Sequence, residues 1–363
     1  MNGIIDADTH VIESEEIWGY FDPALAGKKP ALVAFPDPST GTTTHRWVID
    51  GKLFPKPHGK GGVFLATPPM DAKQAVDLDW ACRSLNDTTT RIQHKDRMGV
   101  QTQVVYPTLF LAYLTDDQAL DIALARSYNR FLAHAWAESV NQLRWVVVPP
   151  LQSIDASIEE LNYGKQNGAV GVFFRGMEGE RSLADPYFFP LYAEAERLDM
   201  PVCVHTGAGA PALTEMCDSR LTAAFSHIRL LPLMAFHDLV YNRVPEQFPA
   251  LRFGFIEAAA SWMPFLLHFL RRRIRMEKRS TEQLGPKLCR EYRMFVACEA
   301  DEDIPYLLNH IGKANLLIGS DYGHHDQSAQ PDLVSYIQAR EDVPPAVVDK
   351  ILRENPRRFY AIA

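Results

Sequence analysis

The chain has 363 residues, of which 47% are hydrophobic, so it can bury the core of one large domain. Its formal net charge at pH 7 is -8, and its densest basic cluster is the short run Arg271–Arg273, which argues against a nucleic-acid-binding protein. No apolar run approaches the roughly 20 residues that span a membrane. The five cysteines are scattered without a CxxC pair, and the first strand begins almost at the N-terminus, so we expect a cytoplasmic protein with reduced thiols and no signal peptide.

Residues 4–10, with the sequence IIDADTH, predict the first strand. Side chains alternate between the two faces of a strand, so Asp6, Asp8 and His10 should point the same way. Carboxylates and an imidazole on one face of a buried strand are costly unless something compensates their charge. A divalent cation is the natural compensation, because carboxylate and imidazole together suit zinc, iron or manganese. The alternative is a solvated strand end with an incidental histidine.

A long segment from Phe21 to Asp71 follows, rich in proline, glycine and threonine. Loops of this length in compact proteins are usually lids, partner-contacting arms or disordered segments. Disorder is disfavoured because residues 47–49 and 53–54 resemble a small hairpin. We therefore expect an insertion that covers the site or forms an oligomerisation arm, in a homo-oligomer or in a hetero-oligomer with a related subunit.

Beyond the insertion, strands and helices alternate. Helices are predicted over residues 88–98, 117–141, 156–164, 186–198, 222–241, 262–278, 303–311 and 344–354. Strands are predicted over residues 103–107, 144–149, 169–174, 201–205, 252–257, 295–299 and 316–321. With the opening strand this makes eight alternating units, which predict a (β/α)8 TIM barrel as a single domain over residues 1–363. An open doubly wound sheet is less favoured, because no glycine-rich phosphate fingerprint follows the first strand.

Potential metal ligands stand at the ends of four predicted strands. They are Asp8 and His10 on the first strand, His205 on the fifth, Glu257 on the sixth and Asp321 on the eighth. A packed barrel prefers valine, isoleucine and leucine inside, so five such residues on one rim are hard to explain by packing. Their clustering at a barrel mouth predicts a metal site.

Two further residues are candidates for substrate binding. Arg175, after the fourth strand, could hold a substrate carboxylate by a bidentate contact, although a structural salt bridge is equally compatible with its position. Trp262 is close enough to Glu257 in the chain to line the pocket, although a core tryptophan is the default interpretation.

The chain resembles the amidohydrolase superfamily, and within it the branch of aminocarboxymuconate-semialdehyde decarboxylase and related benzoate-type decarboxylases. The resemblance spans nearly the whole chain and is carried by Asp8-Thr9-His10, Val204-His205-Thr206-Gly207, Phe248–Arg252, Gly319-Ser320-Asp321-Tyr322 and Glu354–Tyr360. It implies that Asp8, His10, His205 and Asp321 hold a divalent metal. For metal-assisted lytic or hydrolytic chemistry we expect Asp321 to handle the proton. The resemblance further implies a hydrolase or decarboxylase that acts on a small carboxylate or amide.

Glu257 departs from this family pattern, because the decarboxylases carry a catalytic histidine at the end of the sixth strand. Glu257 could act as an acid–base residue, or it could bind a second cation together with His324, with His325 as the reserve nitrogen ligand. Chains that resemble this one in these features include non-haem dinuclear iron or iron–manganese oxygenases. Two functions therefore stay open: a hydrolase or decarboxylase, which we favour slightly, and a dinuclear oxygenase that hydroxylates a small carboxylate. The chain would hold one or two zinc, iron or manganese ions.

Overall fold

The computed structural model describes residues 3–36, 43–56, 59–62, 80–222, 225, 229–282, 284–325 and 327–363. Within them, eight strands pair side by side in one parallel sheet. In sheet order they are β1 (Ile5–His10), β5 (Thr102–Tyr106), β6 (Leu143–Val147), β7 (Ala169–Arg175), β10 (Val202–His205), β11 (Phe253–Ile256), β12 (Met294–Cys298) and β13 (Leu316–Ile318).

The sheet closes on itself through the segment that follows β13. The Asp321 amide donates to the Asp8 carbonyl at 3.0 Å, and the His10 amide donates to the Tyr322 carbonyl at 2.7 Å. Thr9 and Tyr322 form a parallel bridge at the same place. Strand β13 is shorter than predicted, because the backbone turns sharply at Asp321, whose φ is 53°. The prediction of a (β/α)8 TIM barrel is confirmed.

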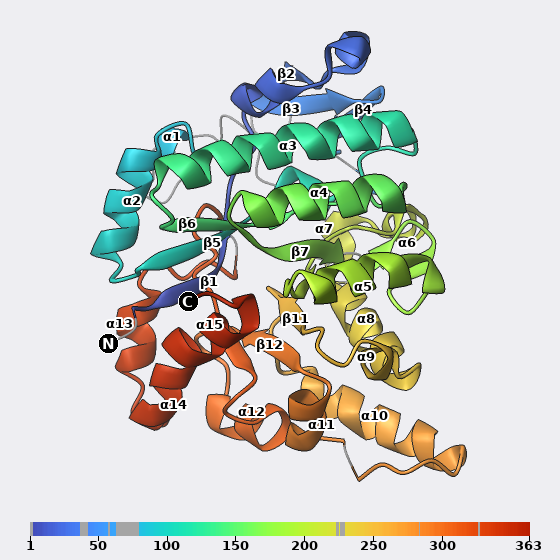
Figure 1. The fold of residues 1–363 in the computed structure, drawn as a ribbon, viewed down its shortest axis with the longest axis vertical. Coiled ribbons are helices and arrows are strands. Elements are labelled where there is room, and N and C mark those ends of the chain that lie inside the picture. Colours follow the sequence, from blue (N-terminus) through green and yellow to red (C-terminus); the bar gives the residue numbers. More distant parts are fainter. Residues whose placement is uncertain are drawn as a thin grey trace.

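Helices surround the barrel (Figure 1). The longer ones are α2 (Thr88–Arg97), α3 (Gln118–Glu138), α4 (Ile154–Gln166), α5 (Phe189–Arg197), α8 (Leu230–Tyr241), α10 (Met263–Met276) and α12 (Ile304–Ile311). The shorter ones are α1 (Trp80–Arg83), α6 (Pro211–Met216), α7 (Ser219–Thr222), α9 (Val244–Gln247), α11 (Pro286–Glu291), α13 (Leu333–Gln338), α14 (Pro345–Asp349) and α15 (Asn355–Tyr360). Side-chain hydrogen bonds fix where several helices begin. At the start of α2, the Asp87 side chain accepts a hydrogen bond from the Thr90 amide at 2.9 Å.

Two predicted helices differ from the structure. The helix expected over residues 222–241 is present as α8 from Leu230 onward, and residues 223, 224 and 226–228 lie outside the described part of the chain. The closing helix expected over residues 344–354 is instead α14 followed by a π-helix over Lys350–Glu354. It continues into α15, where Asn355 donates side-chain hydrogen bonds to the carbonyls of Lys313 and Leu316.

The described part of the insertion forms a three-stranded antiparallel sheet of β2 (Ala31–Pro36), β3 (Thr43–Ile49) and β4 (Lys52–Phe54). Figure 1 shows it beyond α3. Trp47 pairs with Phe54 across the predicted hairpin and packs edge-on against Trp18, with ring centroids 5.8 Å apart. Further along, the Gly61 amide donates to the Cys217 carbonyl at 3.0 Å, in the loop that follows β10. Residues 37–42, 57–58 and 63–79 lie outside the description, so the role of residues 21–71 stays a prediction.

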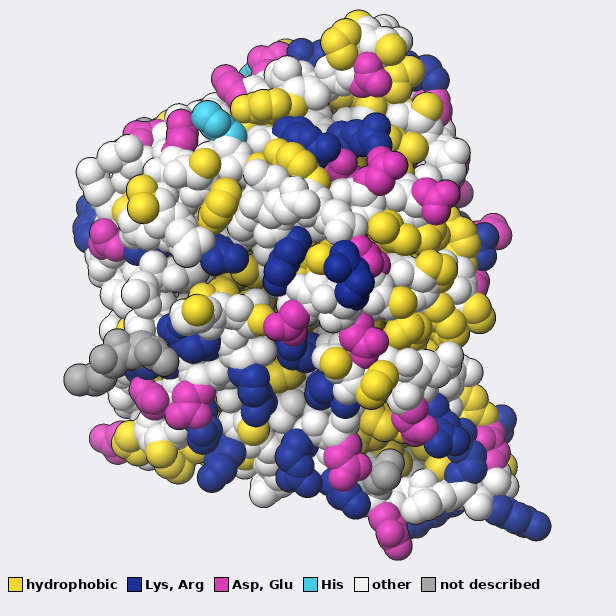
Figure 2. Space-filling model, in the orientation of Figure 1, with side chains coloured by type: hydrophobic (Ala, Val, Ile, Leu, Met, Phe, Trp, Pro, Cys, Tyr) yellow, Lys and Arg dark blue, Asp and Glu magenta, His cyan; other side chains and the backbone are white. Residues whose placement is uncertain are grey.

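The molecular surface in Figure 2 carries basic and acidic side chains interspersed over the face shown, without a large patch of one sign. Neither this distribution of charge nor the net charge of -8 resembles that of a nucleic-acid-binding surface. Among the described helices, none is long and apolar enough to cross a membrane.

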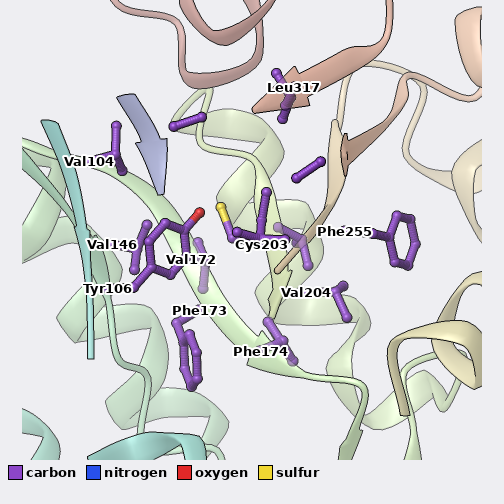
Figure 3. Close-up of a cluster of buried hydrophobic side chains, with 14 of the residues drawn as sticks. Val104, Tyr106, Val146, Val172, Phe173, Phe174, Cys203, Val204, Phe255 and Leu317 are labelled. Carbon is purple, nitrogen blue, oxygen red and sulfur yellow. The ribbon is translucent and has the colours of Figure 1, made fainter. Parts of the chain in front are cut away.

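Side chains of the barrel strands alternate between the interior and the helix layer (Figure 3). Tyr106 and Cys203 point toward each other inside the barrel. Phe174 packs on Phe188 and Tyr192 in the helix layer, with ring centroids 5.5 and 5.8 Å away. Because Cys203 faces inward, the residue two positions later on β10, His205, faces inward as well.

The buried hydroxyl of Tyr360 ties the C-terminal helix to the barrel. It donates to the Ala7 carbonyl at 2.6 Å and lies 2.7 Å from the Tyr106 hydroxyl, which therefore donates to it. We expect Tyr360→Phe to lower the free energy of unfolding by about 1–3 kcal/mol, because it leaves a buried carbonyl and a buried hydroxyl unsatisfied. Urea unfolding measures this. Tyr20→Phe is the control, since Tyr20 is 46% exposed, and an equal change in both variants would contradict the prediction.

Candidate metal centre

The barrel brings six predicted ligands together at the C-terminal ends of its strands. All six are buried, and the most exposed are only 8% accessible. They are Asp8 and His10 on β1, His205 on β10, Glu257 directly after β11, and Asp321 and His324 after β13. They form two overlapping groups of four: Asp8, His10, His205 and Glu257, and then His10, Glu257, Asp321 and His324. The second group contains His324 and not His325.

In the first group, two imidazoles face two carboxylates. His10 Nε2 lies 3.5 Å from Asp8 Oδ1 and 3.4 Å from Glu257 Oε2, and His205 Nε2 lies at the same two distances from the same oxygens. None of these four atoms makes a hydrogen bond within the described structure. A tetrahedral ion with bonds of about 2.0–2.2 Å separates its ligand atoms by about 3.3–3.6 Å. The spacing therefore fits a shared cation.

The outer hydrogen bonds of the two histidines fix which nitrogen faces the centre. His10 Nδ1 lies 2.9 Å from the Pro107 carbonyl, and His205 Nδ1 lies 2.9 Å from the Thr206 carbonyl. A carbonyl can only accept, so each Nδ1 carries the hydrogen and each Nε2 of a neutral ring presents a lone pair. Lone pairs aimed at carboxylate oxygens repel unless positive charge lies between them.

His324 presents its other nitrogen to the centre. The Thr108 hydroxyl donates to the Val11 carbonyl at 2.8 Å, so it accepts from His324 Nε2, 2.9 Å away. His324 Nδ1, 2.8 Å from Asp321 Oδ1, is then the lone-pair nitrogen of the neutral ring. Burial and the neighbouring charge of His10 lower the pKa of His324 well below its usual value, which keeps the ring neutral. The ring also stacks on His10, with centroids 3.8 Å apart.

The carboxylates make this centre attractive to positive charge. Burial lowers the pKa of His10, but the close carboxylates of Asp8 and Glu257 outweigh burial and raise it to about 10. Burial raises the pKa of Asp8, but His205 and His10 together bring it well below its usual range. In the absence of a cation, the carboxylates therefore hold a proton on His10. A metal ion would displace that proton, because an imidazole binds metal only in its neutral form.

Two of the six residues have unusual backbone conformations. Glu257 has φ of 52° and Asp321 has φ of 53°, in the left-handed region that residues other than glycine rarely adopt. Such conformations cost of order 1–3 kcal/mol and cluster at functional sites. Asp6 of β1 holds the residue before Asp321: its carboxylate accepts from the Ser320 amide at 2.8 Å and from the Ser320 hydroxyl at 2.5 Å.

Neither predicted substrate-binding residue belongs to the two ligand groups, although Arg175 is the register partner of His205 on the neighbouring strand. Arg175 donates to Glu178 at 2.9 Å and to the Ala112 carbonyl at 2.6 Å, beside a cavity of about 500 Å³ that none of the six ligands lines. Trp262 packs on Phe236 and Phe255, with ring centroids 5.3 and 6.0 Å away. Arg175 thus forms a structural salt bridge and Trp262 packs against other aromatic rings, which are the alternative interpretations of these two residues. Their roles toward a substrate stay predictions.

Sequence reasoning missed three residues that shape the centre. Thr108 orients His324, Ser320 connects Asp6 to the Asp321 turn, and Arg229 lies beside Glu257, with Nη2 3.7 Å from Oε1. Ser320 directly precedes the predicted ligand Asp321 in the chain, and this position was the one sequence signal of its role. Nothing in the sequence connects Arg229 or Thr108 to strand ends that are distant in the chain.

A family model described as Amidohydrolase matches residues 5–362. The chain belongs to the amidohydrolase family. This confirms the resemblance that the sequence motifs indicated, and with it the prediction of an enzyme of this family.

Two curated relatives are decarboxylases. The chain is 24% identical over 262 residues to 2-amino-3-carboxymuconate-6-semialdehyde decarboxylase of Dictyostelium discoideum. The matched region covers 70% of each chain. It is 28% identical over 130 residues to gamma-resorcylate decarboxylase of Rhizobium sp. (strain MTP-10005). This match covers 34% of the present chain and 40% of the relative.

Solved structures agree on the fold. An amidohydrolase from Mycobacterium avium subsp. paratuberculosis matches with a TM-score of 0.75 and 18% identity over 99% of both chains. The 5-carboxyvanillate decarboxylase of Novosphingobium aromaticivorans, solved with manganese and 4-hydroxy-3-methoxy-5-nitrobenzoic acid, matches with a TM-score of 0.71 and 16% identity over 99% of this chain and 96% of the other. At these identities the likeness supports the barrel fold of the family.

We expect His10→Ala and His205→Ala to lose bound metal while the barrel persists, because each removes a lone-pair nitrogen without touching the packed strands. Elemental analysis by mass spectrometry measures the metal, and circular dichroism checks the fold. His134→Ala is the control, because the His134 side chain is 58% exposed on α3. A double variant of His10 and His205 that remains fully metallated would overturn the assignment.

Proposed function

We propose that this chain is a metal-dependent decarboxylase or hydrolase that acts on a small carboxylate substrate. The observation that carries the proposal is the set of three buried imidazole lone pairs that converge on carboxylates at the barrel mouth. In this proposal Asp8, His10, His205 and Asp321 hold a divalent metal. Decarboxylation is the favoured reaction, because both curated relatives described above are decarboxylases.

A divalent metal bound there would polarise a substrate oxygen and lower the pKa of a bound water. Asp321 would then handle the proton, with His324 Nδ1 2.8 Å from its Oδ1. Glu257 directs Oε2 at the same centre and provides a second carboxylate for acid–base work. Burial of the whole set excludes bulk water, which strengthens each electrostatic contact with the substrate.

The charge of the centre indicates how a carboxylate substrate could bind. Three carboxylates surround the centre, and the one nearby guanidinium, that of Arg229, is shared with Glu299, so at least two negative charges remain around the centre. One divalent cation only neutralises these charges, whereas a second one makes the centre positive and attractive to an anion. Glu257 and His324 of the second group would hold that second cation, with Asp321 close to both.

The test of the reaction uses the metal-loaded protein and a panel of small aromatic carboxylates, including 2,6-dihydroxybenzoate and 5-carboxyvanillate. We expect release of carbon dioxide that a chelator abolishes and added manganese or zinc restores. Asp321→Asn should lower kcat by at least about 100-fold, in the range of a lost general acid–base residue. If the loaded enzyme releases carbon dioxide from no member of the panel, the proposal of a decarboxylase fails.

A dinuclear oxygenase is the second candidate function. It is favoured by one observation: two overlapping four-residue groups give this centre more donors than a single four-coordinate ion needs. In this reading two iron or manganese ions would supply dioxygen chemistry at the same residues. Oxygen consumption that depends on substrate and on a reductant, without carbon dioxide release, would favour this candidate over the first.

We expect Glu257→Gln to lower the metal content of the protein from about two ions per chain toward one, because a neutral amide is a poor ligand between two cations. His324→Ala should give the same result. The measurement is elemental analysis after removal of loosely bound metal, with Glu341→Gln on the surface as the control. A wild type with one ion, whose stoichiometry Glu257→Gln leaves intact while turnover is lost, would make Glu257 an acid–base residue alone.

A further inference from the structure

Arg229 lies immediately before α8, with a side chain that is 14% exposed. Its guanidinium group crosses to Glu257, which directly follows β11. Nη1 donates to the Glu257 backbone carbonyl. Nη2 donates to the Ser328 hydroxyl at 2.5 Å and lies 3.7 Å from Glu257 Oε1. One cation therefore contacts both the main chain and the side chain of a candidate ligand.

The two carboxylate oxygens of Glu257 have different surroundings. Oε2 faces the imidazoles of His10 and His205, 3.4 Å from each Nε2. Oε1 faces away from them, 3.5 Å from the Ser328 hydroxyl and within reach of Arg229. A free carboxylate can rotate and present either oxygen or both to a cation. The contacts on Oε1 favour the rotamer that presents Oε2 to the centre.

The backbone at Glu257 also needs support, because its φ of 52° is unfavourable for a residue with a side chain. The hydrogen bond from Arg229 to the Glu257 carbonyl holds this peptide in place. Lysine could supply the charge but not the planar fork that reaches the carbonyl, the Ser328 hydroxyl and the carboxylate together.

We infer that Arg229 is a positioning residue, which fixes Glu257 so that Oε2 alone is presented to the metal centre. The inference rests on the proposed function in taking Glu257 as a ligand. It does not depend on which reaction the centre performs. Arg229 acts here through Glu257 and contributes no ligand atom of its own.

The experiment measures the affinity of the full-length protein for Mn²⁺ by competition with a chelator, so that no turnover is needed. Two effects of Arg229→Gln have opposite signs. Removing a positive charge near a cation site should tighten metal binding, whereas releasing Glu257 should weaken it. Because outer partners of metal ligands typically contribute 10–100-fold in affinity, we expect Arg229→Gln to weaken Mn²⁺ binding by at least about tenfold.

Two further variants separate positioning from charge. Arg229→Lys keeps the charge and loses the fork, so it should weaken Mn²⁺ binding as well. Once Glu257→Gln is present, adding Arg229→Gln should cause little further loss, because both changes act on one interaction. Arg126→Gln, at a guanidinium that is 43% exposed on α3, is the matched control and should leave the affinity unchanged.

Binding of Mn²⁺ by Arg229→Gln as tight as that of the wild type, or tighter, overturns the inference. Additive losses from the Glu257 and Arg229 changes overturn it too. If Arg229→Gln does not fold, Ser328→Ala makes the same comparison, because it removes the hydroxyl between Nη2 and Oε1, and an unchanged affinity would then count against the inference. Loss of decarboxylase activity without a change in Mn²⁺ affinity would leave the proposed function standing and remove the role of Arg229.

Discussion

The constraint on which the site depends is the burial of negative charge at one end of the barrel. Asp8, Glu257 and Asp321 are 3%, 8% and 2% exposed, and Asp8 and Glu257 each direct an oxygen at the Nε2 atoms of His10 and His205. Buried charge of one sign is expensive unless a cation balances it, by several kcal/mol per ion even after the protein relaxes. The folded barrel can keep these buried carboxylates only if another interaction offsets that cost. Metal binding is the interaction that fits the donors present.

The closure of the barrel creates this concentration of charge. Strand β13 ends early, and the segment after it pairs with β1, so that the Asp321 amide reaches the Asp8 carbonyl. This contact places two carboxylates on neighbouring chain segments that are more than three hundred residues apart in sequence. The turn that achieves it puts Asp321 in the left-handed region, where Asp6 and Ser320 hold it by hydrogen bonds. The fold and the site thus share one set of interactions.

Several features of this arrangement follow from local sequence rules. Alternation along β1 predicts that Asp8 and His10 face the same way, and strand ends at His205, Glu257 and Asp321 place their side chains on one rim. The order of eight strands predicts a barrel, which brings those ends together. These inferences succeed because the periodicity of a strand and the topology of the barrel leave few alternatives.

Other features depend on tertiary packing that no short pattern encodes. Trp262 follows Glu257 closely in the chain, yet its ring packs against Phe236 of α8. Arg175 is the last residue of β7, yet its side chain pairs with Glu178 in the hairpin just beyond that strand. Thr108 selects the tautomer of His324 through a hydrogen bond between residues that are 216 positions apart. Each outcome is decided by a partner that is fixed only once the helices have docked.

Glu257 shows how one side chain can change the charge balance around a metal centre. A histidine at that position would bring a neutral ring that needs no counter-charge, whereas a glutamate adds a third carboxylate to the centre. That extra charge calls for an additional positive group, and the structure provides one in Arg229, 3.7 Å from Oε1. Arg229 also lies 3.8 Å from Glu299, whose pKa is raised by burial, so its charge is divided between two acidic groups. The guanidinium alone therefore does not neutralise the glutamate, and the remaining negative charge favours a metal ion at Oε2.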